Sequence, residues 1–328
     1  MSTLMGLPAA AQRLVAGAPL VLDGQTLAVD LQAMLRLQRV ARKGDLAGET
    51  VAQGRAAMRE NTALVGGRQP IGRVRDLAVG DLPGRLYEPT RTTGSGLLVF
   101  YHGGGFLYGD LVSHDAPCRF LAERSGVRVL AVEYRVGPEA GFPAAFDDGE
   151  AALRWVHEHA EELGADPGRI GVGGDSAGGN IAAWSAIAAA RADLPVAFQL
   201  LVYPCTDVNR DTASLRLFGE GLYLTADSIA FFHDIYLPRA ELRADPRLNL
   251  LDVDLPPGLA PAHVVTAGFD PLRDEGEDYA RRLAEAGVDV ELKRYADQIH
   301  GFLNIVGVGR TSRAAVLEIA GRLRAALG

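Results

Sequence analysis

The sequence predicts an α/β fold, in which helices cover both faces of a mostly parallel β-sheet and further helices form a cap. Two features lead to this prediction. Short, continuous apolar runs alternate with longer helix-forming segments through the middle of the chain, and this alternation is typical of parallel strands buried on both faces. Helical stretches without intervening strands occur at the start and in one later insertion, which places the cap there.

Residues 1–70 are predicted to form an N-terminal helical cap segment. Their apolar side chains fall near helical spacing in two groups, namely Leu31, Met34, Leu35 and Val40, and then Val51, Ala56 and Met58. A segment of this size at the start of the chain is too small to form a core of its own. The alternative is an ordinary N-terminal arm that packs on the core.

The core begins at residues 71–89, where short strands and turn residues replace the helical pattern. The turn signals Gly80-Asp81 and Pro83-Gly84 indicate an antiparallel pair of strands at a sheet edge. Continuous apolar strands are expected to follow at 97–101, 127–132, 170–172, 199–202 and 263–267. Helices are expected between them at 118–125, 143–162, 176–191 and 274–286.

A last strand, near residues 288–295, brings the expected sheet to eight strands. Its apolar residues Val288, Val290 and Leu292 alternate with charged ones, as in a half-exposed strand near a sheet edge. Such an edge can pair with a second copy of the chain, which would give a homodimer.

The segment 206–255 breaks the rhythm of strand and helix, and it contains several prolines and a helical stretch at 228–236. We expect it to be a second cap insertion. The core then consists of residues 71–205 and 256–328.

The composition excludes several classes of protein. A length of 328 residues with 48% hydrophobic and 23% charged residues suits one large α/β domain. The net charge of −8 and the lack of a basic stripe argue against a nucleic-acid partner. No apolar run is long enough to span a membrane, and no basic residue precedes Arg13, so we expect no signal peptide. Cys118 and Cys205 are far apart and form no metal or redox spacing. A disulfide between them is an alternative, but a reduced, cytoplasmic location is expected.

A serine lies at the apex of a predicted strand–turn–helix unit. The pattern Gly174-x-Ser176-x-Gly178 is that of a nucleophile elbow, in which the residues flanking a strained serine must be small. The serine hydroxyl would then point out above the sheet, beside the free N–H groups of a helix N-terminus. The pattern alone is weak, and the alternative is a tight connection with an idle serine.

Three glycines follow the first buried strand, in His102-Gly103-Gly104-Gly105. Bare backbone N–H groups at this place suit an oxyanion hole, which holds the charge of a tetrahedral intermediate. We therefore expect the donors to be the N–H groups of Gly103, Gly104 and Ala177. A phosphate-binding loop is the alternative, but it lacks the P-loop lysine. His102 is expected to hold the glycine loop by hydrogen bonds rather than to act as a base.

Asp270 follows the predicted strand at 263–267, and His300 lies on the loop after the edge strand. Taken singly, Asp270 could be a helix-capping residue, and His300 could be an idle loop histidine. The order Ser176, Asp270, His300 is nevertheless that of one known catalytic triad, and all three positions fall at the carboxyl edge of the sheet. Asp274 and Glu275 are interpreted as charges that complement a helix dipole.

Five segments together carry a family resemblance: His102–Phe106, Tyr134–Glu139, Gly174–Gly179, Asp270–Glu275 and His300–Phe302. With them the chain resembles the hormone-sensitive-lipase-like family of α/β-hydrolases, the bacterial group IV esterases. Asp175 before the serine resembles the GDSAG branch. The resemblance implies an α/β-hydrolase fold, a carboxylic ester hydrolase without a cofactor, and a cap made from both helical segments. It also implies dimers through the last strand.

The expected function is that of a serine carboxylesterase, in which Ser176, His300 and Asp270 act through an acyl-enzyme intermediate on short- to medium-chain acyl esters. No metal is expected. An amidase, lactonase or formamidase would use the same triad, and this alternative stays open. A non-catalytic small-molecule receptor is another, but the receptors of this family lack the catalytic histidine. Positions in the chain suggest Phe106, Tyr108, Leu222 and Phe231 as pocket residues, although apolar residues of this kind more often belong to plain core or cap packing.

Overall fold

The computed structural model describes residues 9–40 and 50–328. Its main sheet has eight strands in the order β10-β9-β8-β7-β5-β6-β4-β3. All neighbouring strands are parallel except at one edge, where β4 pairs antiparallel with both β3 and β6. The strands are β3 Arg73–Val79, β4 Leu82–Glu88, β5 Leu97–Tyr101, β6 Arg128–Val132, β7 Ile170–Asp175, β8 Phe198–Val202, β9 Ala262–Phe269 and β10 Val290–Ile299. The predicted α/β-hydrolase architecture with an antiparallel pair at one edge is therefore confirmed.

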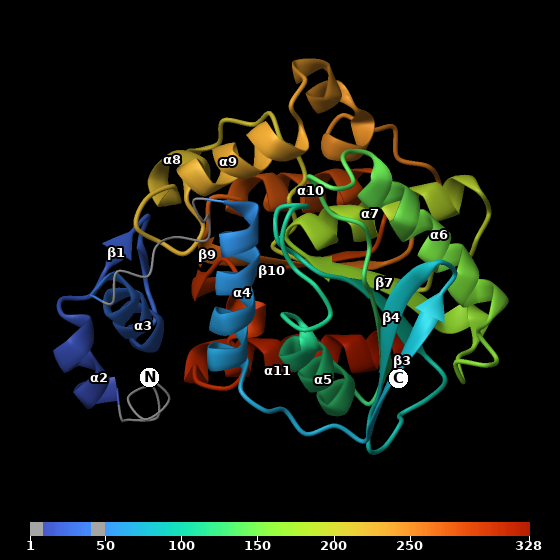
Figure 1. Cartoon of the computed structure of the whole chain (residues 1–328), viewed down its shortest axis with the longest axis horizontal. Coiled ribbons are helices and arrows are strands. Elements are labelled where there is room, and N and C mark those ends of the chain that lie inside the picture. Colours follow the sequence, from blue (N-terminus) through green and yellow to red (C-terminus); the bar gives the residue numbers. More distant parts are fainter. Residues whose placement is uncertain (1–8, 41–49) are drawn as a thin grey trace.

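Helices cover both faces of the sheet (Figure 1). On one face lie α5 (Asp115–Ser125) and α11 (Arg310–Leu327), and on the other lie α6 (Ala144–Glu158), α7 (Ala177–Arg191) and α10 (Arg273–Glu285). Side chains alternate along a strand, so each strand serves both layers. In β5, Val99 packs in the core on the α6 and α7 side, whereas Phe100 packs in the core on the α5 and α11 side. This double burial explains the continuous apolar runs in the sequence.

The two predicted cap segments are mainly helical. The first contains α2 (Ala9–Ala16), a small hairpin of β1 (Val21–Leu22) and β2 (Gln25–Thr26), α3 (Val29–Val40) and α4 (Val51–Gly66). The second contains α8 (Ala213–Phe218) and α9 (Ala226–Tyr236), which lie together at the upper left of Figure 1. The rest of the expected first segment, residues 1–8 and 41–49, lies outside the described residues. Short 3₁₀ turns occupy Pro167–Arg169, Ala240–Ala244, Pro246–Leu248 and Phe302–Asn304.

The structure differs from the sequence-based expectations at several elements. Sequence patterns did not predict α8, α11 or the β1–β2 hairpin. The helix expected at 143–162 ends at Glu158, before a turn. The last strand was expected near 288–295 but begins at Val290 and continues to Ile299. Its second half loses the alternating pattern because Gln298 and Ile299 are both buried. This extension matters for the site, since it carries the chain directly to His300.

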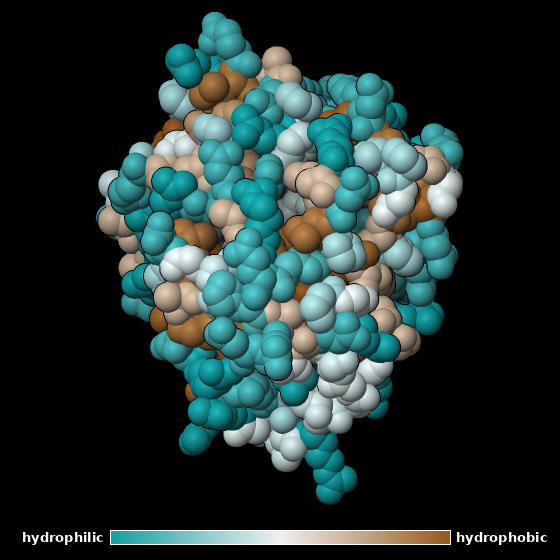
Figure 2. Space-filling view, turned by 90° about the vertical axis from the view of Figure 1, so that its right-hand side faces the viewer, coloured by the Kyte–Doolittle hydropathy of each residue, from teal (hydrophilic) through white to brown (hydrophobic). Residues whose placement is uncertain are grey.

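In the described part of the chain, no helix is both long and apolar enough to cross a bilayer. Figure 2 shows the face on the side of α6 and the β3–β4 pair. Hydrophilic side chains cover most of this face, and hydrophobic residues appear there as small, separated spots rather than one continuous patch.

Candidate active site

Ser176 lies at the sharp turn between β7 and α7. Its backbone has φ 57° and ψ −122°, a conformation that is strained for a residue with a side chain. The flanking glycines allow the turn to close, because a Cβ on Gly174 would lie 2.3 Å from the Gly178 carbonyl oxygen, and one on Gly178 would lie 2.0 Å from that of Tyr101. The Ser176 N–H donates to the Val202 carbonyl of β8 at 3.0 Å, which ties the turn to the sheet.

A chain of two hydrogen bonds joins the three residues that the sequence proposed as a triad. Nε2 of His300 lies 3.0 Å from the Ser176 hydroxyl, and Nδ1 lies 2.8 Å from Oδ2 of Asp270. Asp270 is fully buried, and its other oxygen accepts the Leu272 N–H at 2.9 Å. When Nδ1 carries the hydrogen donated to Asp270, Nε2 is free to accept the hydrogen of the serine. The three residues come from the carboxyl ends of β7, β9 and β10, which meet at one edge of the sheet.

The glycine loop after β5 differs from the sequence-based expectation at one position. The Gly103 N–H, expected as a free donor, instead donates to Oδ1 of Asp175 at 2.9 Å. Within the described ranges, the N–H groups of Gly104 and Gly105 have no acceptor. Gly105 and Ala177 also line the same pocket as Ser176. The free donors of this loop therefore lie one residue further along the chain than the sequence suggested.

His102 is buried behind this loop. Its ring lies 3.0 Å, through Nδ1, from the Gly103 carbonyl oxygen, and it stacks on Tyr134 with 4.2 Å between ring centres. The Tyr134 hydroxyl donates to the His102 carbonyl at 2.6 Å. Burial lowers the pKa of His102 to about 4, so its imidazole is neutral at pH 7. These contacts agree with the structural role expected for His102.

Buried polar groups surround Asp175, and no sequence pattern pointed to them. Nε2 of His114 lies 3.3 Å from Oδ1 of Asp175, and the Tyr203 hydroxyl donates to its Oδ2 at 3.3 Å. Burial opposes ionisation of Asp175, but His114 and the Gly103 N–H outweigh it and lower the pKa of the carboxyl. Tyr203 also packs its ring 4.6 Å from that of His300. No local pattern announces His114 or Tyr203, because only the fold brings them to Asp175.

Glu275 lies in the first turn of α10, where the sequence suggested a charge that complements the helix dipole, but its side chain is buried. It is 5% exposed and accepts the Thr206 N–H at 2.8 Å, which holds the loop after β8. Burial raises the pKa of Glu275 to about 8, and the nearby carboxylates of Asp207 and Asp270 add to this shift. The neighbouring Asp274 accepts the Ser214 N–H at 2.8 Å and so ties helix α8 to the start of α10.

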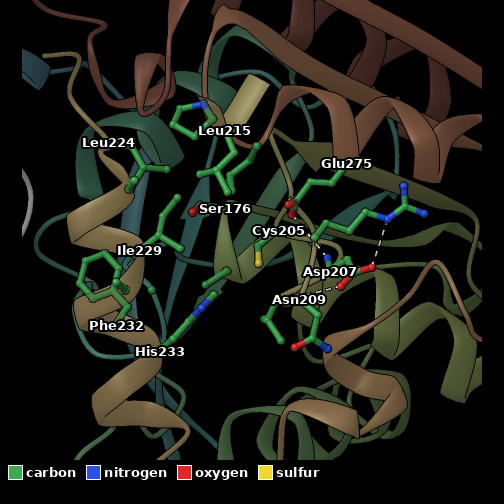
Figure 3. Close-up of a pocket in the computed structure, with 18 of the residues that line it drawn as sticks. Ser176, Cys205, Asp207, Asn209, Leu215, Leu224, Ile229, Phe232, His233 and Glu275 are labelled. Carbon is green, nitrogen blue, oxygen red and sulfur yellow. Dashed lines mark hydrogen bonds and ion pairs between the residues drawn. The ribbon is translucent and has the colours of Figure 1, made fainter. Parts of the chain in front are cut away.

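A pocket of about 290 Å³ opens over Ser176. Figure 3 shows one side of it lined from α9 and the segment just before this helix, by Leu224, Ile229, Phe232 and His233. The opposite side is lined by Glu275, Asp207 and Asn209. Ser176 and Cys205 lie between the two sides. Most other lining residues are apolar. Of the four pocket residues suggested from the sequence, Phe106 lines this pocket, whereas Tyr108, Leu222 and Phe231 do not.

The remaining histidines lie away from Ser176, except His233. The ring of His159 stacks on Trp155 at 4.2 Å, and His263 is buried in β9. His233 lines the pocket, and burial lowers its pKa to about 4. Among the residues with described positions, no three His, Cys, Asp or Glu side chains gather as a metal site would require.

A family model described as an α/β hydrolase fold matches residues 98–304, more than half of the chain. The chain belongs to the hormone-sensitive-lipase-like family of α/β-hydrolases. This α/β-hydrolase is 43% identical over 341 aligned residues to the carboxylic ester hydrolase LipN of Mycobacterium tuberculosis. The alignment covers 100% of this chain and 90% of LipN. It is 36% identical to an ethyl acetate hydrolase of Pseudomonas putida, over 84% of this chain and 92% of the relative.

Comparison with solved structures also finds an esterase that is similar over most of the chain. An esterase of Pyrobaculum calidifontis superposes on this α/β-hydrolase with a TM-score of 0.83 and 36% sequence identity. The match covers 89% of this chain and 98% of that one. The shared part therefore includes nearly the whole of the archaeal enzyme.

Proposed function

We propose that this protein is a carboxylic ester hydrolase that works through a Ser176–His300–Asp270 triad and an acyl-enzyme intermediate. The observation that carries the proposal is the chain of hydrogen bonds from Ser176 through His300 to the buried Asp270, at 3.0 Å and 2.8 Å. Relatives named as ester hydrolases, alignable over most of the chain, support the choice of an ester substrate.

In the proposed reaction, His300 takes the proton of Ser176 as its oxygen attacks the ester carbonyl carbon. Asp270 orients the imidazole and stabilises its charged form. The N–H groups of Gly104, Gly105 and Ala177 hold the oxyanion, with Gly103 in a supporting position. Collapse of the intermediate breaks the bond to the alcohol, which leaves with the proton from His300. A water molecule then repeats these steps on the acyl-enzyme.

The pocket over Ser176 supports short- to medium-chain acyl groups. Its volume of about 290 Å³ lies at the lower end of the range for small-molecule sites. Its apolar walls, which include Phe106, Leu224 and Ile229, favour a hydrocarbon chain over a charged one.

The same triad could hydrolyse an amide or a lactone, so the test compares substrate classes. Wild type, Ser176→Ala and the control Ser95→Ala, which changes an exposed serine, are assayed on p-nitrophenyl esters from acetate to palmitate and on a matching anilide. We expect hydrolysis of short esters by wild type and the control, with Ser176→Ala slower on the order of a millionfold. Cleavage of the anilide alone would favour an amidase, and a wild type inert on every substrate would favour the receptor.

We further propose that two copies pair through the outer edge of β10. Among the described strands, β10 hydrogen-bonds only to β9, and its exposed residues include Leu292, which is 41% exposed. Light scattering after size-exclusion chromatography is expected to give twice the 34.8 kDa chain mass for wild type, and the monomer mass for a Leu292→Asp variant. A monomeric wild type would refute this pairing.

A further inference from the structure

Arg55 on the cap helix α4 makes four hydrogen bonds to two loops. One loop continues from the glycine segment to Leu107, and the other contains Gly137 and Glu139. Nε donates to the Leu107 carbonyl at 2.8 Å, and Nη2 donates to the Gly137 carbonyl at 2.6 Å. Nη1 and Nη2 of the guanidinium also donate to the two carboxylate oxygens of Glu139, at 2.9 Å and 2.7 Å. A further hydrogen bond, from the Gly137 N–H to the Phe106 carbonyl at 2.9 Å, joins the two loops. One guanidinium therefore fixes both loops relative to the cap.

The glycine loop is also enclosed by packing from the cap. A Cβ on Gly105 would lie 2.5 Å from the ring of Phe232 on α9, so this ring lies directly on the loop. Tyr236 of the same helix stacks on Phe106 with 4.8 Å between ring centres. On the other side, a Cβ on Gly54 of α4 would lie 2.0 Å from the Tyr108 hydroxyl.

The backbone of this segment needs such support. Phe106 has φ 61°, in the left-handed region that is unfavourable for a residue with a side chain. A conformation of this kind is unfavourable and persists only where the surroundings impose it. The core holds the start of the loop through the Gly103 N–H on Asp175 and the His102 carbonyl, and it reaches Phe106 through the Gly137 N–H and the Phe146 ring. Further contacts on residues 105–108 come from α4 and α9.

We infer that Arg55 is a positioning residue for catalysis, which places the Gly104 and Gly105 N–H groups through its hold on Leu107 and Gly137. The inference rests on the proposed function, because those groups are the oxyanion donors assigned there. The ion pair itself contributes little to the free energy of unfolding, since the Glu139 side chain is 65% exposed. Its effect falls on geometry, and small displacements of oxyanion donors have large effects on rate.

The experiment compares Arg55→Met, which keeps an apolar stem, with Arg55→Lys and with Glu60→Gln, an exposed residue on the same helix. Steady-state kinetics on p-nitrophenyl butyrate are expected to show kcat lowered about tenfold to a hundredfold in Arg55→Met. KM should stay within about twofold, and the control should match wild type. Arg55→Lys should fall between, because an ammonium cannot form the bidentate fork.

A second readout reports on the oxyanion hole itself. A trifluoromethyl ketone adds to Ser176: the serine oxygen bonds to the carbonyl carbon, the hydroxyl proton passes to His300, and the carbonyl oxygen becomes an oxyanion. The inhibition constant should rise in Arg55→Met by about the factor by which kcat falls. A merely structural change, which lowers the fraction of folded enzyme, would lower kcat per total protein and leave this constant unchanged.

An unchanged kcat, or a higher KM at constant kcat, would overturn the inference while the proposed function stands on the Ser176→Ala result. A wild type without esterase activity would overturn both. If Arg55→Met does not fold, Arg55→Lys and Glu139→Gln give the test, with a several-fold lower kcat expected in each. Wild-type kcat in both would then refute the role of Arg55.

Discussion

The backbone N–H of Gly103 donates a hydrogen bond of 2.9 Å to the carboxylate of Asp175, the residue immediately before Ser176. This bond joins the end of β7 to the loop after β5, whose strands are neighbours in the sheet. The proposed nucleophile and the proposed oxyanion donors are thus held together by one buried contact within the core.

Replacing Asp175 by alanine should therefore lower kcat. The change leaves the buried Gly103 N–H without an acceptor, a loss that costs about 1–3 kcal/mol, and it frees the start of the glycine loop. We expect kcat on p-nitrophenyl butyrate to fall about tenfold or more, with a lower melting temperature. Asp175→Asn keeps an acceptor oxygen and should be affected less. Equal kcat in Asp175→Ala and wild type would contradict this account.

Asp270→Asn should lower kcat by about 10⁴-fold, as for the corresponding change in other serine hydrolases. The amide can donate to Nδ1 of His300, which favours the tautomer with its hydrogen on Nε2, facing Ser176. That tautomer cannot accept the serine proton. Circular dichroism would check that the variant is folded. Turnover close to wild type would rule out Asp270 as the acid of the triad.

The acyl-chain preference should respond to Ile229, which lines the pocket from α9. Ile229→Trp should reduce kcat/KM for hexanoate and octanoate esters about tenfold or more while sparing acetate, because the larger side chain fills the space for the chain. Ile229→Ala should shift the preference to longer chains. The matched control is Ile235→Ala, on the same helix but outside the pocket. An identical chain-length profile in all variants would show that the acyl group binds elsewhere.

Glu275 should make stability fall as pH rises. Its pKa in the folded protein is about 8, above its ordinary value of 4.5, because the side chain is buried. Between these pH values the folded protein keeps a proton that the unfolded chain releases. The stabilisation is complete below pH 4.5 and is lost as pH rises to 8, by at most about 1.4 kcal/mol per pH unit.

Glu275→Gln cannot ionise but keeps an acceptor for the Thr206 N–H. Urea unfolding at pH 5, 6.5 and 8 should show wild type losing stability relative to this variant as pH rises. Glu60→Gln, which changes an exposed carboxylate, should show no such trend. A constant difference between wild type and Glu275→Gln across this range would show that Glu275 is already ionised at pH 5.

Local patterns in the sequence predicted much of the fold. The continuous apolar runs located the five strands β5 to β9, because strands buried on both faces leave few polar positions. The same approach missed α11, whose apolar residues such as Val316 and Leu323 are spread over one helix face. It also placed the last strand too early. The alternation of apolar and charged residues does not continue into the second half of β10, where Gln298 and Ile299 are both buried.

The sequence by itself determined which residues could form the site. The glycines around Ser176 are required by backbone sterics at the turn, and their spacing can be read directly from the sequence. The order Ser176, Asp270, His300 follows from the order of the strands and can be read in the same way. Only the tertiary structure decided which groups are free to react. It gave the Gly103 N–H a partner in Asp175, buried Glu275, and brought Arg55 onto the loops beside the glycines. These outcomes depend on contacts between residues distant in sequence, for which a single sequence contains no local signal.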